Sequence, residues 1–273
     1  MDTNSDQLIR FMLPKQRVRG CFIRATNIKA DACHAHGLHG DAATMFSQML
    51  LGTIMLLSIN KSGVRQVLQL DAGSDAAAPI QRMLGEVRAG CVRGYIRWQH
   101  AVTQKRDGTP DITAWMGTPL LISTVRDTGM GEPFVSTVES DAAYMADHLM
   151  RYLQQSVQTR ADLVLDDDIA LLLEAMPGCS EEAWFEAMGG LAKVDLKALR
   201  DGAESSLVEA FSPLKLHVVG RDPYRWHCGC QPERMLESLK NMPLEQLQEL
   251  ADTDGQVRVS CQYCGKEHSV AIG

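Results

Sequence analysis

Four cysteines in the last fifth of the chain form two close pairs, Cys228 and Cys230 in HCGC, and Cys261 and Cys264 in CQYCG. Four thiolates on two such turns are the soft ligands that tetrahedral zinc prefers, with Zn–S distances of ~2.3 Å. The same sulfurs could form a structural disulfide staple or a redox couple. The CxC…CxxC pattern favours one Zn²⁺ ion, and free thiols in helices and turns are the simpler alternative.

The chemistry of these thiols also suits a sensor of oxidants. A disulfide between Cys228 and Cys230 would close a small ring, which is prone to strain and therefore to reduction. Oxidants attack the thiolate form of cysteine, and zinc keeps its ligands as thiolates at neutral pH. Oxidation of four zinc-bound thiolates would eject the metal.

The N-terminal sequence and the apolar stretches predict the cellular compartment. MDTNSDQLIRFMLPKQR lacks the basic and long apolar regions of a signal peptide, and the longest apolar stretch, residues 49–57, is far shorter than a membrane span. We therefore expect a cytoplasmic protein that does not bind membranes. Cytosolic thiols are kept reduced, which argues against a permanent disulfide staple.

Composition places the chain among ordinary soluble globular proteins. It has 273 residues, of which 45% are hydrophobic and 22% charged. The 34 acidic residues outnumber the 27 basic ones, giving a net charge of −7. A negative charge argues against nonspecific binding to nucleic acid or to anionic membranes, because both require a basic face.

Residues 1–175 are expected to form an N-terminal α+β domain of mixed sheet and helices. Alternating and β-branched residues predict strands, and longer apolar segments predict helices. The predicted strands are residues 18–28, 64–70, 118–125 and 132–138, and the predicted helices are residues 41–59 and 141–158. In the second helix, Met145, Leu149, Tyr152 and Leu153 share one face. Residues 161–178 fit either two strands joined at three aspartates or a helix after them.

A helical linker, residues 176–227, is expected to follow. Pro177 and Gly178 mark its start, and Ser180 with two following glutamates is typical of a helix N-terminus. Short helical fragments then continue to Ser212 and Pro213.

Residues 228–273 are expected to form a small C-terminal zinc-binding redox-switch domain. Pro232 and Pro243 each stand near the start of a predicted short helix, and Asp254 and Gly255 turn the chain into a strand that leads to Cys261. A unit this small rarely obtains more than ~3–5 kcal/mol from its own core, whereas a structural zinc ion contributes an apparent ~10–16 kcal/mol. Loss of zinc should therefore unfold the domain.

The sequence resembles the heat-shock protein 33 family of redox-regulated holdase chaperones. The resemblance rests first on HCGCQPERMLESLKNMPLEQLQELADTDGQVRVSCQYCGKEH, where the CxC, two short helices, an acidic-Gly turn and the CxxCG occur in order. It extends to VRG at residues 18–20, VRGY at 92–95, GTPLLISTVRDTGMGEPFVSTV, YLQQSVQTR and AMPG. It therefore spans most of the chain, although only the cysteine motif is highly specific.

The resemblance implies a function for the cysteine pairs. Cys228, Cys230, Cys261 and Cys264 would bind zinc when reduced; on oxidation Cys228 would pair with Cys230, and Cys261 with Cys264. The zinc domain and linker would then unfold and uncover apolar surface that binds unfolding client proteins. The family further implies an active homodimer that later passes its clients to ATP-dependent foldase chaperones.

The other candidate residues have simpler interpretations. Cys21, Cys33, Cys91 and Cys179 are expected to be small buried hydrophobic residues, and Met45, Met49 and Met55 to be core. CHAHGLH, with Cys33, His34, His36 and His39, is a weak second metal candidate; His227 is expected to be solvated, and Trp226 and Tyr224 to pack at the linker junction. Asp166, Asp167 and Asp168 are expected to form a solvated turn rather than a cation site.

Two other classes of function remain open. A zinc ribbon that binds protein is possible, but residues 228–273 carry seven acidic and four basic residues, which argues against nucleic acid. A thiol oxidoreductase would require CQYC at the exposed N-terminus of a helix, whereas here a strand leads into the motif. We find no nucleophile–base, P-loop or dinucleotide-binding motif, and we expect no enzyme.

Overall fold

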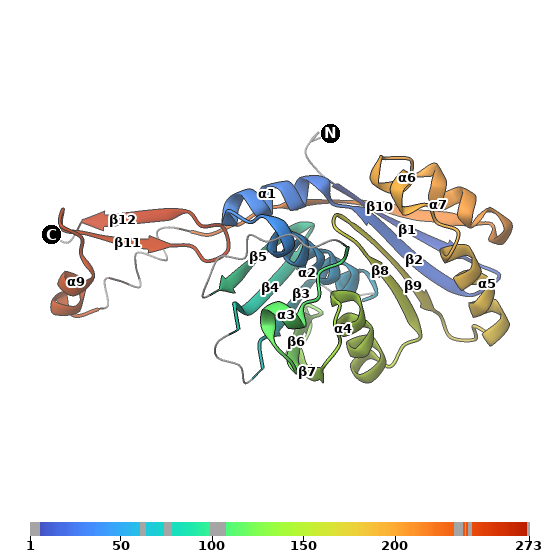
Figure 1. Cartoon of the computed structure of the whole chain (residues 1–273), viewed down its shortest axis with the longest axis horizontal. Helices are drawn as coiled ribbons and strands as arrows, with labels where there is room; N and C mark the ends of the chain where they lie inside the picture. Colours follow the sequence, from blue (N-terminus) through green and yellow to red (C-terminus); the bar gives the residue numbers. More distant parts are fainter. Residues whose placement is uncertain are drawn as a thin grey trace.

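The computed structural model describes residues 6–60, 64–73, 78–98, 108–231, 237, 239 and 242–271. In these residues, ten strands form one sheet in the order β7-β6-β3-β4-β5-β10-β1-β2-β9-β8, and two more strands form a separate hairpin. Figure 1 shows the hairpin projecting from one end of the body that contains the large sheet. The predicted α+β class is confirmed.

The first half of the large sheet is antiparallel. Its strands are β3 (Arg65–Asp71), β4 (Ile80–Arg88), β5 (Cys91–Trp98), β6 (Leu120–Asp127) and β7 (Phe134–Ser140). The short helix α3 (Thr113–Met116) precedes β6. Residues 64–70, 118–125 and 132–138 were predicted as strands, and the structure places β3, β6 and β7 there.

The second half of the sheet brings the N-terminus beside later parts of the chain. It contains β1 (Asp6–Leu13), β2 (Val18–Arg24), β8 (Ala161–Leu165), β9 (Ile169–Ala175) and β10 (His217–Trp226). The uncertain segment 161–178 therefore contains two strands joined at the three aspartates. The predicted strand at 18–28 ends at Arg24, and its last residues begin helix α1 (Thr26–His36).

Helix α2 (Gly40–Ser58) packs against strands from both halves of the sheet and forms the centre of the main core. Met45, Met49 and Met55 are all buried there, as predicted. This helix is long and apolar enough to cross a membrane, but 83% of its most apolar 18-residue window is buried inside the protein. Its composition is therefore that of a core helix in a large sheet protein.

Helix α4 (Met145–Tyr152) closes the same core and continues into a π-helical turn at Leu153–Val157. The four residues predicted to share its apolar face are all buried, with exposures between 0% and 7%: Met145, Leu149, Tyr152 and Leu153. The 3.6-residue period thus identified this face correctly.

A second core lies on the opposite face of β1, β2 and β9, beneath the helices of the predicted linker. These are α5 (Glu181–Leu191), α6 (Leu196–Arg200) and α7 (Ser205–Ala210), followed by a 3₁₀ turn at Ser212–Leu214. The Ser180 side chain accepts a hydrogen bond from the backbone N–H of Ala183 at 3.2 Å, which confirms the predicted helix cap.

Part of segment 176–227, which was predicted to be helical, differs from the prediction. Residues 217–226 are strand β10, which pairs antiparallel with β1 and parallel with β5. Gly220 and Pro223 disfavour a helix, and the exposed side chains of β10 give it no strand-like alternation of apolar residues. Pairing with the backbone of β1, which is distant in the sequence, therefore stabilises β10 as a strand.

The C-terminal part contains helix α9 (Leu244–Leu250) and the antiparallel strands β11 (Gln256–Ser260) and β12 (Glu267–Ala271). The helix near Pro243 and the strand leading to Cys261 were both predicted. The other helix, predicted near Pro232, falls on a segment largely outside the described residues.

Candidate metal centre

The sulfur atoms of all four predicted cysteines converge at the junction between the large sheet and the hairpin. The Cys228 and Cys261 Sγ atoms lie 3.7 Å apart, and the Cys230 and Cys264 Sγ atoms lie 3.6 Å apart. All four lie within 4.8 Å of one another. Sulfurs at ~2.3 Å from the centre of a tetrahedron would be ~3.8 Å apart, so this arrangement could hold a metal ion.

The second cysteine pair is shaped by a tight turn after β11. The Gly265 N–H donates to the Cys261 carbonyl at 2.8 Å, and the Cys261 N–H donates to the Lys266 carbonyl at 2.9 Å. Gly265 has φ of +67°, and a Cβ atom there would lie 2.7 Å from the Ala35 carbonyl oxygen of α1. Glycine is therefore required both for the backbone conformation and for the close approach to α1.

The first pair lies directly after β10, whose end is attached to β5. The Arg225 N–H donates to the Gly90 carbonyl at 3.0 Å, and the His227 N–H donates to the Val92 carbonyl at 2.9 Å. Cys228 is the next residue after His227. The metal candidate therefore joins the end of a sheet strand to the C-terminal hairpin.

Neighbouring thiols affect the pKa values of Cys230 and Cys261. Burial, together with the neighbouring thiols of Cys264 and Cys228, raises the pKa of Cys230 to about 12. Burial also raises the pKa of Cys261, but the Tyr263 N–H and the thiols of Cys264 and Cys228 bring it below its usual value overall. Four thiolates this close repel one another, so a bound cation is what would allow all four to ionise together.

Tyr263, between the two cysteines of CQYC, packs against β5. The guanidinium carbon of Arg93 lies 4.3 Å from the centroid of the Tyr263 ring, and the Tyr95 ring meets it edge-on with centroids 5.5 Å apart. Arg93 is itself held by the buried Glu86 carboxylate, to which it donates at 2.8 Å. The hairpin is thus positioned on the large sheet by an aromatic residue inside the cysteine motif.

His36 of α1 holds the same loop by its backbone. Its Nε2 lies 3.1 Å from the Tyr263 carbonyl and 3.1 Å from the Gly94 carbonyl, and since both oxygens only accept, Nε2 carries the proton. Burial lowers the pKa of His36. Its ring packs edge-on against Phe46 and Trp226, so one imidazole connects the cysteine loop, β5 and the main core.

These docking residues were missed by sequence reasoning. Arg93, Tyr95 and Tyr263 look like ordinary surface residues in the sequence, and His36 was considered only as a metal ligand. The one local signal was an aromatic residue placed inside a CxxC turn.

The other metal candidate does not assemble. Within the described ranges, the four sulfurs form the one group of three or more His, Cys, Asp or Glu side chains close enough to hold a metal ion. Cys33 and the histidines near it do not form such a group there. Trp226 and Tyr224 pack at the junction as predicted, and Tyr224 is buried.

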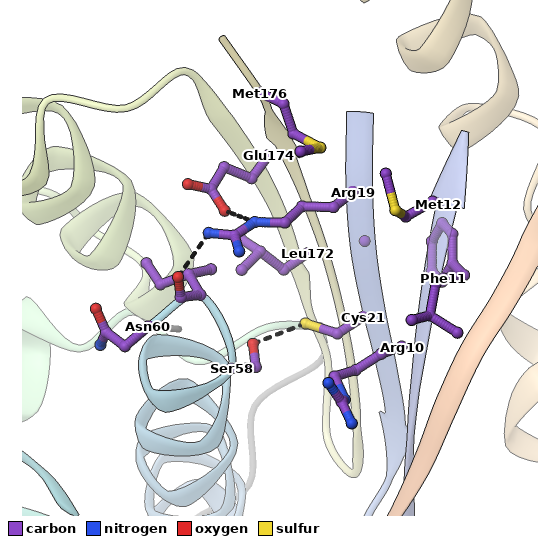
Figure 2. Close-up of a pocket in the computed structure, with 13 residues that line it drawn as sticks. Arg10, Phe11, Met12, Arg19, Cys21, Ser58, Asn60, Leu172, Glu174 and Met176 are labelled. Atoms are coloured by element: carbon purple, nitrogen blue, oxygen red, sulfur yellow. Dashed lines mark hydrogen bonds and ion pairs between the residues drawn. The ribbon is translucent and has the colours of Figure 1, made fainter. Parts of the chain in front are cut away.

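The remaining cysteines differ in exposure. Cys21 is buried, as predicted, while Cys33, Cys91 and Cys179 are only half-buried. Cys21 borders a hollow of about 330 Å³ between the sheet and the end of α2 (Figure 2), and its Sγ lies 2.9 Å from the Ser58 Oγ. Burial raises the pKa of Cys21 to about 11, so this thiol is far less ionised than an ordinary one.

The three consecutive aspartates are not the solvated turn that was predicted. Each carboxylate pairs with at least one helix side chain, and together they contact α1, α2 and α6. The pairs are Asp166 with Arg200 of α6, Asp167 with Lys29 of α1 and Thr44 of α2, and Asp168 with Thr26 of α1. Because α6 belongs to the predicted linker, this turn fastens the linker to the N-terminal part of the chain.

Comparisons with known proteins identify the family of the chain. A family model described as Hsp33 protein matches residues 6–271. A 33 kDa chaperonin of Lactiplantibacillus plantarum is 24% identical over 97% of this chain and 94% of its own length. A 33 kDa chaperonin of Geobacter sulfurreducens is 25% identical over 97% of this chain and 92% of its own length.

A solved structure agrees with the architecture. The crystal structure of a 33 kDa chaperonin from Thermotoga maritima superposes with a TM-score of 0.79 at 19% identity. It covers 98% of this chain and 95% of the other. At this identity the match supports the shared fold, while the family model supports the assignment: the chain belongs to the Hsp33 family, a family of chaperones and not of enzymes.

Proposed function

We propose that this protein is a redox-regulated holdase chaperone whose activity is controlled by Cys228, Cys230, Cys261 and Cys264. The observation that carries the proposal is the convergence of the four sulfurs within 4.8 Å at the end of β10. Four thiolates in a tetrahedral arrangement favour Zn²⁺, so the reduced chain would hold one zinc ion.

Oxidation would convert the thiolate ligands of the zinc ion into disulfides. Two thiolates and one peroxide molecule give one disulfide and two hydroxide ions, so the four cysteines give up four electrons to two peroxide molecules. The family resemblance pairs Cys228 with Cys230 and Cys261 with Cys264. Disulfide sulfurs are poor ligands compared with thiolates, so the cage can no longer hold its metal.

The hairpin is built so that it depends on this cage. Among the side chains described in residues 242–243 and 245–269, the buried apolar ones are Val257 and Cys261. So small a core stabilises very little, whereas structural zinc contributes an apparent ~10–16 kcal/mol. Opening the cage would therefore unfold the C-terminal part and loosen β10 with it.

We further propose that residues 1–175 form the chaperone domain, residues 176–227 the linker, and residues 228–273 the redox switch. In the oxidised state the linker would leave the second core, which lies beneath α5, α6 and α7. The exposed apolar surface would bind unfolding client proteins in the cytoplasm. The active form would be a homodimer, and clients would pass later to ATP-dependent foldases.

A comparison of two forms of the full-length chain tests this function. Zinc-loaded reduced protein and peroxide-treated protein are each mixed with a heat-unfolding client, and aggregation is followed by light scattering. We expect protection only from the oxidised form, and the same switch in a Cys179→Ser variant, since Cys179 lies outside the cage. Equal protection by both forms would contradict the proposal.

A further inference from the structure

Strand β10 lies in the middle of the large sheet, although it is connected at one end to the linker helices and at the other to the redox switch. It follows the linker helices, and Cys228 lies two residues after its last residue, Trp226. In the described part of the chain it is also the strand that joins the two halves of the sheet, between β5 and β1. Its removal would open the edges of both neighbouring strands.

Apart from Tyr224 and Trp226 at its end, which pack against the main core, side chains hold β10 only weakly. Among its ten described residues one side chain, that of Tyr224, is buried, while Val218 and Val219 are 48% and 58% exposed. Its pairing with β1 is also irregular, because the register shifts between Arg10 and Phe11. Backbone hydrogen bonds and partly exposed ion pairs therefore provide most of its attachment.

Strand β1, in contrast, is held by buried side chains. Leu8, Ile9, Phe11 and Leu13 are each no more than 2% exposed, and they are divided between the two cores of the protein. Its other edge is paired along six positions with β2. Strand β1 would therefore stay in place if β10 left.

The backbone groups that would lose their partners can be identified. The N–H groups of Arg225 and His227 point to β5, so alternate residues, Asp222 and Tyr224, point their peptide groups to β1. Asp222 lies opposite Leu8, and Gly220 opposite Arg10. The peptide groups of Leu8 and Arg10 thus face β10, whereas those of Ile9 and Phe11 face β2.

The surface beside the β1 edge could also contact the side chains of a segment paired with it. Figure 2 shows a hollow beside β1 and β2, with walls formed by apolar side chains and the basic residues Arg10 and Arg19. Val219 of β10 lines it together with Met12, Ile59, Leu172 and Met176. Arg10 binds the carboxylate of Asp222 at 2.6 Å, so the present occupant of this edge contributes an acidic side chain.

We propose that β10 is a displaceable strand, and that the β1 edge it leaves is paired antiparallel by an extended segment of an unfolding polypeptide. The favoured segment would carry an aliphatic residue at the hollow and an acidic residue near Arg10, as β10 does. Main-chain hydrogen bonds are independent of sequence, which suits a site that must accept many clients. This inference rests on the proposed function, since the cysteine cage must open before β10 can leave.

Residue-resolved amide hydrogen exchange of the full-length chain tests the proposal. On oxidation, the Leu8 and Arg10 amides should exchange about a hundredfold faster, and a bound heat-unfolding client should slow them again. The Ile9 and Phe11 amides serve as controls in the same strand and should change less than about threefold. If Leu8 and Arg10 stay protected on oxidation, or gain no protection with client bound, strand pairing at this edge is wrong.

A synthetic peptide with the β10 sequence HVVGRDPYRW provides a second measurement. It should compete with the client for the oxidised chain. Methylation of the backbone nitrogen at the Asp222 position should weaken competition at least about tenfold, because that N–H faces β1. The same methyl group at the Arg221 position should have little effect, and equal competition by both methylated peptides would contradict the proposal.

The two proposals fail in different ways. If the oxidised chain does not prevent client aggregation, the chaperone switch itself is wrong. If it does prevent aggregation while Leu8 and Arg10 exchange like Ile9 and Phe11, the switch stands and only the strand-pairing site is overturned.

Discussion

The Tyr263 carbonyl accepts a hydrogen bond from the His36 Nε2 at 3.1 Å, so the loop between Cys261 and Cys264 is fastened to helix α1. The same imidazole donates to Gly94 of β5. The cysteine cage is therefore in direct contact with the sheet domain, in addition to its covalent connection through β10. A change at the sulfurs would be transmitted to the sheet at two places.

Removal of the Tyr263 ring should make the switch more sensitive. The cation–π contact with Arg93 and the edge-on contact with Tyr95 together are worth about 2 kcal/mol, so Tyr263→Ala should speed zinc release at fixed peroxide by up to about thirtyfold. Tyr263→Phe keeps the ring and serves as the control. A release rate for Tyr263→Ala equal to that of Tyr263→Phe would show that docking does not restrain the cage.

Loss of two ligands should unfold the hairpin alone. In a Cys261→Ser/Cys264→Ser variant under reducing conditions, we expect no tightly bound zinc and rapid proteolysis within residues 242–271. The sheet domain should remain resistant, because its cores do not include the hairpin. Cys179→Ser is the matched control, and one zinc ion per chain in the double variant would overturn the ligand assignment.

Release of the linker helix α6 should follow removal of one arginine. Arg200 pairs with Asp166 and Asp168, and its backbone carbonyl accepts from Arg24. Because these groups are partly exposed, Arg200→Ala should cost no more than about 1 kcal/mol, but it should raise proteolysis of the linker in the reduced state. Arg151→Ala removes an ion pair with Asp141 outside the linker and should leave linker cleavage unchanged.

Acid should destabilise the sheet domain through His148. Burial lowers the pKa of this side chain to about 4 from 6.5, and its Nδ1 lies 2.7 Å from the Ser140 Oγ. Above pH 6.5 the folded and unfolded states are both neutral at this residue, whereas between pH 6.5 and 4 only the unfolded state binds the proton. Stability should therefore fall over this range by up to roughly 3 kcal/mol.

Chemical denaturation at several pH values measures this loss. His148→Gln should show a shallower decline than the natural sequence between pH 6.5 and 4. The exposed His217→Gln serves as the control and should follow the natural sequence. Identical slopes for all three proteins would mean that His148 does not titrate as proposed.

Local patterns in the sequence predicted the elements that bury their own side chains. The Met-rich helix α2, the apolar face of α4 and the Ser180 cap are all encoded within a few residues, and each was found. Strand β10 was missed because Gly220, Pro223 and its exposed side chains carry no strand pattern, and because its stability comes from pairing with β1 about 210 residues earlier.

In the candidate site, too, some features were predicted from local sequence and others were not. The spacing of the four cysteines identified the cage, since metal ligands are recognisable by residue type. The contacts of Tyr263 with Arg93, Tyr95 and His36 depend on tertiary packing, and so do those of the three aspartates with their helices. The sequence alone does not show which residues far apart in the chain will make such contacts.

A peroxide titration of the full-length, zinc-loaded chain tests the central claim most directly. Released zinc is read with a chromogenic chelator, and protection of a heat-unfolding client is read by light scattering from the same samples. Protection should rise in parallel with zinc release, reach its plateau near two peroxide molecules per chain, and disappear on reduction with zinc restored. Protection that is full before any zinc is released, or zinc retained at full protection, would contradict the account.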